Sequence, residues 1–185
     1  MGRSTRSRSF PTSYIPTTTA SVARTADIAV MTGTNFSSWY NQSEGTFFVS
    51  GDLALPTKGS NQFLARASDN SYNNSVAINC DSTGFGALVT ASGGVFDGNA
   101  SVANAFTVNT VFKAAGSYAT NSLACCVNAN TVATDSSATI PTALTRLDIG
   151  ADHGGFNRIG SGHIRIIQYF PRRVANEQLQ ALTAS

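Results

Sequence analysis

The densest group of polar side chains in the sequence lies in one short loop, whose candidate binding residues are Asp152, His153, Phe156, Asn157 and Arg158. Carboxylate, amide and guanidinium groups hydrogen-bond to sugar hydroxyls, and a phenylalanine ring can stack on a sugar face. A plain turn explains the same residues, because Gly154 and Gly155 allow a tight reversal and Asp and Asn side chains bond to local backbone. The loop is therefore a candidate glycan-binding site, with the turn as the alternative.

The sequence contains few candidate catalytic residues. Glycoside hydrolysis needs two carboxyl groups flanking one bond, yet the only glutamates are Glu44 and Glu177, and neither has an aspartate two residues further on. Serine hydrolysis needs a base beside the nucleophile, but the only histidines are His153 and His163, and no G-x-S-x-G precedes a helix pattern. We expect no catalytic residues, no cofactor and no enzymatic activity.

The sequence gives little support for a metal site or for a disulfide bond. The sequence has no D-x-D-x-D spacing for calcium and no C-x-x-C pair for zinc, so we expect no metal site. Cys125 and Cys126 are neighbours that would point to opposite faces of a strand, which leaves Cys80 with one of them as the only easy bridge. We expect three reduced thiols in a protein made in a cytoplasm, with that bridge as the open alternative.

Positive charge is concentrated at the beginning of the sequence. Arginines within the first ten residues supply three positive charges, and the remainder sums to −1 although the whole chain carries +2. Residues 1–20 are polar and proline-spaced, which predicts an extended N-terminal arm. Because three arginines are few for nucleic-acid binding, we expect this arm to dock on a protein partner. Its candidate docking residues are Arg3, Arg6, Arg8 and Tyr14.

Residues 21–185 have the composition of an all-β domain. Only 12% of the whole chain is charged, and its polarity comes from Ser, Thr, Asn and Gly, which favour turns between β-branched and aromatic strand residues. Short alternating segments recur roughly every 8–12 residues, as in an antiparallel β-sandwich or jelly roll. No apolar run reaches the roughly 18 residues of a membrane span, so we expect no membrane partner.

Individual segments give more specific predictions. In the segment 146–149, Leu147 and Ile149 should face the core, with Arg146 and Asp148 on the other face. A hairpin should turn at Asn128–Ala129–Asn130. The longest candidate strand is 105–118, with Phe106, Val108 and Phe112 on one face. A short C-terminal helix should begin with Asn176 as its N-cap.

Two further groups have two interpretations each. Trp39 and Tyr40 are more typical of a core than of a stacking platform. Arginines at positions 165, 172 and 173 could meet an acidic partner, but pairing with Asp148 or Glu177 is at least as well supported.

The last forty residues carry a more specific pattern. Ile149–Gly150, a loop at 151–161, the strand start at 162–166 and the close Leu179–Thr183 follow one another. This succession resembles the closing segment of concanavalin A-like (laminin-G-like) lectin and glucanase jelly rolls. The segment Pro171–Arg173 and the entry at 11–27 most resemble versions carried by bacteriophage virion proteins. The similarity spans roughly 11–184 and implies a jelly roll with an extended arm and a short C-terminal helix.

The resemblance implies a function as well as a fold. It suggests a non-enzymatic structural protein of a bacteriophage virion, a capsid decoration or accessory shell protein, made in the bacterial cytoplasm. Its partners would be copies of itself and other capsid or tail proteins. One alternative is a carbohydrate-binding receptor module of a tail fibre or adhesin, and another is a minor coat protein whose arm contacts nucleic acid. The family's central hairpin often has an Asp-Gly turn, which this chain lacks at 128–130, so family functions tied to that turn are in doubt.

Overall fold

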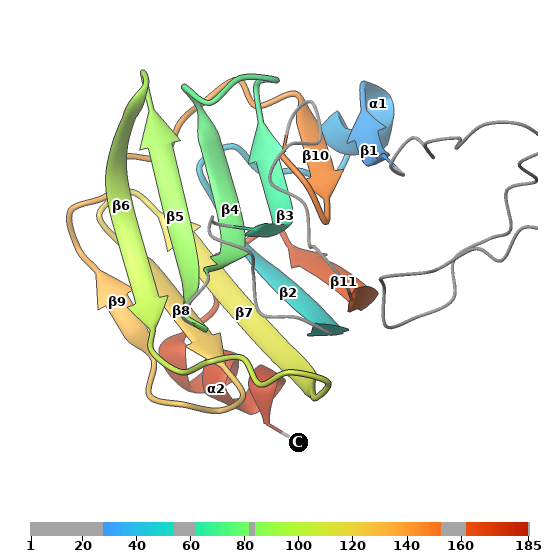
Figure 1. Ribbon diagram of the computed structural model, residues 1–185. Coiled ribbons are helices and arrows are strands. Elements are labelled where there is room, and N and C mark those ends of the chain that lie inside the picture. Colours follow the sequence, from blue (N-terminus) through green and yellow to red (C-terminus); the bar gives the residue numbers. More distant parts are fainter. Residues whose placement is uncertain (1–27, 54–61, 82–83, 153–161, 185) are drawn as a thin grey trace, which may run out of the picture.

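A computed structural model describes residues 28–53, 62–81, 84–152 and 162–184. Two antiparallel sheets pack face to face, which confirms the β-sandwich predicted from the strand pattern (Figure 1). The six-stranded sheet has the order β1 (Ala29–Thr32), β10 (Arg146–Ile149), β3 (Gln62–Ser68), β4 (Ser75–Cys80), β5 (Gly86–Ser92), β6 (Val95–Val102). The five-stranded sheet has the order β11 (Gly162–Phe170), β2 (Glu44–Leu53), β7 (Val111–Ala119), β8 (Leu123–Val127), β9 (Ala133–Asp135). The helices are α1 (Thr34–Ser37) and α2 (Asn176–Thr183).

The core lies between the two sheets and follows the alternation of the strands. Phe47 and Val49 on β2 are fully buried there, as is Leu64 on β3. Leu147 and Ile149 also face this core, whereas Arg146 and Asp148 lie on the other face of β10, as predicted. An aromatic group closes the end near α1, where the ring of Trp39 meets Phe36 and Tyr169 edge-on and Tyr40 is 7% exposed. The core interpretation of Trp39 and Tyr40 thus agrees with the structure.

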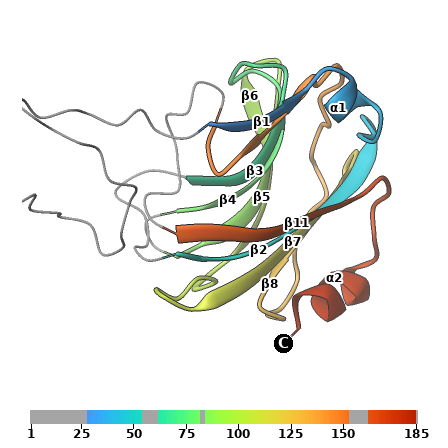
Figure 2. The ribbon, with the colours of Figure 1, turned by 90° about the vertical axis from the view of Figure 1, so that its right-hand side faces the viewer.

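Helix α2 packs on the outer face of the five-stranded sheet, opposite the core (Figure 2). Leu179 is fully buried there against Phe48 and Cys126. Near the helix end, the hydroxyl of Thr183 accepts a bond from the backbone N–H of Ala129 at 3.1 Å, which joins the helix to the β8–β9 turn. The predicted N-cap is wrong by one residue. Ala175 is the cap, and the side chain of Gln178 accepts its backbone N–H at 3.3 Å.

The longest predicted strand is only half correct. β7 begins at Val111, and two turns precede it, in which Asn104 and Asn109 adopt positive φ angles of 51° and 57°. Phe106 and Phe112 do meet, with ring centroids 4.9 Å apart, but Val108 is 38% exposed. Asparagine tolerates the left-handed conformation better than most residues, so turns form here although the alternation of apolar and polar residues predicts a continuous strand.

The hairpin at 128–130 and the three thiols are as expected. β8 and β9 pair antiparallel, and Asn128 and Ala129 between them have positive φ. Cys80, Cys125 and Cys126 are all buried and free. No helix within the described residues is long and apolar enough to span a membrane.

Candidate functional site

Only Asp152 of the predicted loop site lies among the described residues. Its side chain is 1% exposed, and its carboxylate accepts a short hydrogen bond from the hydroxyl of Tyr72. This carboxylate is therefore engaged inside the protein rather than presented to a ligand. His153, Phe156, Asn157 and Arg158 lie outside the described residues, as do Arg3, Arg6, Arg8 and Tyr14 of the predicted arm.

Asp152 belongs to a buried ionic group on the outer face of the six-stranded sheet. Arg66 on β3 is 1% exposed, and its Nη2 donates to the carbonyl of Ser71 at 2.7 Å. Its guanidinium lies 5.3 Å from the ring centroids of both Phe63 and Tyr72, a cation–π arrangement. Burial lowers the pKa of Arg66, whereas the charges of Asp152 and Asp148 raise it. This group holds the β3–β4 loop over the sheet, which is a structural role.

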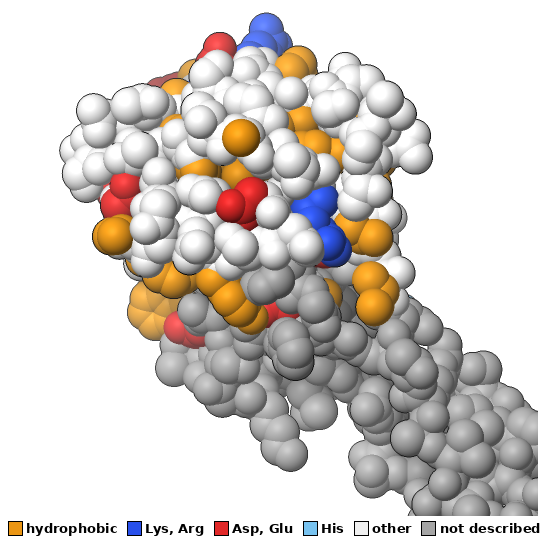
Figure 3. All heavy atoms as spheres, turned by 90° about the horizontal axis from the view of Figure 1, so that it is seen from above, with side chains coloured by type: hydrophobic (Ala, Val, Ile, Leu, Met, Phe, Trp, Pro, Cys, Tyr) orange, Lys and Arg blue, Asp and Glu red, His pale blue; other side chains and the backbone are white. Residues whose placement is uncertain are grey.

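The β3–β4 loop in turn holds the tip of the β5–β6 hairpin. The backbone N–H of Gly94 donates to the carbonyl of Asn73 at 2.9 Å, and that of Gly93 to the Asn74 side chain at 3.0 Å. Both glycines have positive φ, which a tight hairpin turn requires. The end of the sandwich that carries these turns shows mainly backbone and side chains that are neither hydrophobic nor charged, with few charged side chains (Figure 3).

Directly after this turn, β6 borders a hollow that combines an aromatic ring with carboxylates and an amide. Its volume is about 440 Å³, and we call it the Phe96 hollow. The described residues that line it are Val89, Phe96, Asp97, Gly98, Asn99 and Asp135. Phe96 is 66% exposed, although a large apolar ring is ordinarily drawn inward. The hollow thus has an open apolar platform beside hydrogen-bonding groups.

Asp135 reaches this hollow from the opposite sheet. Its Oδ2 accepts the backbone N–H of Asn99 at 2.8 Å, and its Oδ1 accepts both the N–H and the hydroxyl of Ser137. These bonds, the one from Asn99 foremost, hold the pKa of Asp135 below its usual value. Asp97 accepts from the Thr90 hydroxyl at 3.3 Å through Oδ1. Within the described part of the chain, its second oxygen and the side-chain amide of Asn99 have no hydrogen-bond partner, which leaves both available to a ligand.

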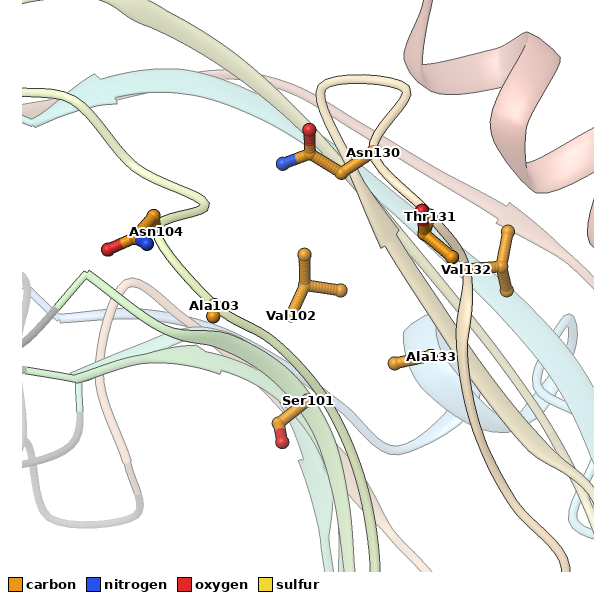
Figure 4. A pocket seen from close by; sticks show the side chains of 8 residues that line it. All are labelled: Ser101, Val102, Ala103, Asn104, Asn130, Thr131, Val132 and Ala133. Carbon is orange, nitrogen blue, oxygen red and sulfur yellow. The ribbon is translucent and has the colours of Figure 1, made fainter.

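A second hollow lies further along the same strand. Its volume is about 480 Å³, and its described lining is Ser101, Val102, Ala103, Asn104, Asn130, Thr131, Val132 and Ala133 (Figure 4). The end of β6 and the two residues after it form one side, and the segment from the β8–β9 turn into β9 forms the other. It has amide and hydroxyl groups but no charged or aromatic side chain among these residues. Its volume is slightly larger than that of the Phe96 hollow, but it offers a ligand neither an aromatic ring nor a charged group among its described lining residues.

Arg165 and Arg173 are engaged with the protein itself, but not with the predicted partners Asp148 and Glu177, and the exposed side chain of Arg172 has no partner among the described residues. Asp52 on β2 accepts from Arg165 at 2.9 Å and contacts His163 at 3.0 Å, and these partners lower its pKa, His163 foremost. Asp148 pairs with Arg146 of its own strand rather than with Arg165 or its neighbours. Arg173 donates from its backbone to Glu44 and from its side chain to carbonyls. No cluster of three or more His, Cys, Asp or Glu that could hold a metal occurs in the described ranges.

No protein-family model matches this sequence, and no curated protein sequence does. Solved structures do resemble the fold. The carbohydrate-binding module CBM40 of the Ruminococcus gnavus IT-sialidase, bound to α2,3-sialyllactose, has a TM-score of 0.65 at 13% identity, over 77% of this chain and 84% of that one. A variant of the NanB sialidase from Streptococcus pneumoniae has a TM-score of 0.67 at 13% identity, over 82% of this chain and 26% of that one.

A more distant similarity is to the heptameric SAP-like pentraxin of Limulus polyphemus, with a TM-score of 0.53 at 12% identity, over 74% of this chain and 68% of that one. At such identities the likeness defines the fold and nothing finer. The chain has a lectin-like jelly roll of the kind that carbohydrate-binding modules and pentraxins share.

The sequence analysis did not find the residues of the Phe96 hollow. Residues 95–102 were not recognised as a strand, because the inward positions Gly98 and Ala100 add little hydrophobic signal. The neighbouring Phe, Asp, Gly and Asn of residues 96–99 were a usable signal for a polar site with an aromatic platform. Asp135 carried none, since only folding brings it to Asn99.

Proposed function

We propose that this domain binds carbohydrate in the Phe96 hollow and does no catalysis there. The observation that carries the proposal is the exposed ring of Phe96 beside Asp97 and Asn99 in an open hollow of about 440 Å³. Sugars have a polar rim of hydroxyls and an apolar C–H face, and this hollow offers a counterpart to both. The R. gnavus module, whose structures hold sialyllactose, supports the compatibility of this fold with sugar binding.

The polar groups have free hydrogen-bonding capacity of the right kind. The second oxygen of Asp97 accepts from sugar hydroxyls, and the Asn99 amide both donates and accepts. One aromatic ring and two polar side chains are sufficient for weak, specific binding of one or two sugar units.

Binding without hydrolysis is supported by the state of the carboxylates. A glycosidase needs one carboxyl group with a raised pKa that donates a proton to the leaving oxygen. In Asp135 the pKa is lowered instead, by bonds from Asn99 and Ser137, so that this group stays ionised near neutral pH. It serves as an acceptor rather than as a general acid.

Binding of the wild-type domain to a broad glycan array, followed by titration calorimetry with the sugars found, tests the proposal. Phe96→Ala should weaken binding about tenfold or more, since about 1.4 kcal/mol corresponds to a factor of ten. Val95→Ala is the matched control, because Val95 is adjacent and 62% exposed but lies outside the described lining. Equal affinity of the Phe96→Ala variant and the wild type would place binding elsewhere.

The virion role expected from the sequence remains a separate prediction. The structural similarities support the lectin-like fold, and thus the carbohydrate-binding alternative better than a capsid or shell protein. Homo-oligomer formation, localisation in a virion and docking through the arm are expectations that particle-occupancy measurements after deletion of residues 1–10 would test.

A further inference from the structure

The Phe96 hollow carries a charge pattern that bears on which sugars it accepts. Its described lining includes the carboxylates of Asp97 and Asp135 and no lysine or arginine. A carboxylate, sulfate or phosphate on a sugar that lay on Phe96 would be brought close to both. From this pattern we infer that the hollow selects neutral sugars and discriminates against anionic ones, an inference that rests on the proposed function.

The negative charge of the hollow is fixed by the fold. Asp135 is held by three hydrogen bonds, from the backbone of Asn99 and from both donor groups of Ser137, and its pKa is lowered. Asp97 is the residue at which β5 and β6 slip out of register, because Thr90 pairs with Gly98 and Ala91 pairs with Phe96. This irregularity leaves Asp97 without a partner in the β5–β6 register, between the ring of Phe96 and Asn99.

The described lysines and arginines lie outside the lining of the Phe96 hollow. Arg66 lies in the same cross-strand row as Val89 and Asn99, but β4 and β5 separate it from β6, and its side chain is 1% exposed. Two strand spacings of about 4.8 Å already place β3 roughly 10 Å from β5. Its charge is balanced by Asp148 and Asp152, and its guanidinium is covered by the ring of Tyr72. It therefore offers little compensation to an anion in the Phe96 hollow.

Other described cations are bound at distant elements. Arg146 is paired with Asp148 on β10, Arg165 with Asp52 on the opposite sheet, and the ammonium of Lys113 donates to the carbonyl of Ala184 beyond α2. None of these residues lines the hollow. The two carboxylates therefore set its local potential.

Neutral sugars match the same carboxylates. One hydroxyl of a hexose can donate to the second oxygen of Asp97 and a neighbouring hydroxyl can bond to the Asn99 amide, while the C–H face lies on the ring of Phe96. A uronic acid presents the same ring hydroxyls, but its C6 hydroxyl is replaced by a negatively charged carboxylate. Repulsion by two carboxylates a few ångströms away, in a site open to water, amounts to about a tenfold loss of affinity at low salt, or about 1.4 kcal/mol.

Matched sugar pairs isolate this charge effect. The probes are the methyl glycosides of glucose, galactose and mannose, each beside its uronic acid, in which the C6 alcohol is a carboxylate. For each sugar that binds, the neutral member should bind about tenfold tighter at roughly 20 mM salt, and the difference should shrink at roughly 500 mM salt, where charges are screened within a few ångströms.

The Asp97→Asn variant tests the same charge effect by substitution. Its amide oxygen can still accept a hydrogen bond from the Thr90 hydroxyl, while the negative charge is lost. Discrimination within each pair should fall to about threefold or less, because Asp135 alone then repels the anion, and this ratio reports the charge effect whatever the substitution does to the affinity for neutral sugars. Uronic acids that bind the wild type as tightly as the neutral sugars would overturn the inference while leaving the proposed function standing. Failure of every sugar to bind would overturn the proposed function, and the inference with it.

Discussion

Replacement of Asp152 distinguishes a binding residue from a structural one. Asp152→Ala removes the acceptor of the Tyr72 hydroxyl and one of the two negative charges that most compensate Arg66. A hydrogen bond to a charged group contributes about 1.5–3 kcal/mol, and breaking a buried ion pair costs about 3–5 kcal/mol. Tyr72 is 45% exposed and its hydroxyl can rehydrate, and Arg66 keeps Asp148, so the lower part of these ranges applies.

We therefore expect Asp152→Ala to lower the free energy of unfolding by about 2–3 kcal/mol. At about 2–4 °C per kcal/mol for a domain of this size, the melting temperature should fall by roughly 4–12 °C. Asp152→Asn keeps an acceptor and should lose less. Urea unfolding and thermal scans measure both variants, beside the glycan titration. If Asp152→Ala abolishes glycan binding while its melting temperature stays within about 1 °C of the wild type, the structural assignment is wrong and the loop at 151–158 is the site.

Two other predictions concern buried groups. Burial raises the pKa of three tyrosines well above the ordinary value of about 10; they are Tyr40, Tyr118 and Tyr169. Their contribution to stability is present below about pH 10 and is lost as the pH rises toward the folded values, so the tyrosinate absorbance of these three residues should appear at pH 11 only with unfolding, and ready titration of all five tyrosines of the chain in the folded protein would contradict this. Gly98→Ala should lower the free energy of unfolding by about 1–3 kcal/mol, because an added Cβ would lie 2.6 Å from the Cβ of Ala138 and 2.7 Å from Cδ1 of Leu123. Urea unfolding measures this loss, with Ser101→Ala at an exposed position of the same strand as the control. An unchanged urea midpoint for Gly98→Ala would contradict the prediction.

The sequence predicts the architecture better than the site, for reasons that individual strands illustrate. Large residues at alternate positions, such as Leu147 and Ile149, mark a strand and its inner face in the sequence alone. β6 has Gly98 and Ala100 at the equivalent positions, and at Gly98 the facing side chains of Leu123 and Ala138 leave no room for a larger residue. Where tertiary packing selects small residues, the alternation of hydrophobic and polar residues is lost from the sequence. For this reason no sequence pattern indicates β6, the strand that borders both hollows.

The site also depends on contacts between distant segments. Asn99 and Asp135 are 36 residues apart, on different sheets, and their hydrogen bond has no trace in local spacing. Conversely, the polar loop that stood out in the sequence contributes Asp152 to a buried ionic group. A cluster of polar residues in a sequence indicates that hydrogen bonds will form, but whether their partners are internal or external depends on the fold.

The hydrogen bonds from Gly93 and Gly94 to the β3–β4 loop have a thermodynamic consequence for a ligand on Phe96. A side chain on a tethered hairpin gives up little freedom on binding, whereas ordering a mobile one costs about 0.5–1.5 kcal/mol. Because association needs no rearrangement of the hairpin, weak affinity should show as rapid dissociation of the sugar. With a small platform that cannot tighten around its ligand, strong attachment would come from avidity, through several copies that engage one glycan-coated surface at once.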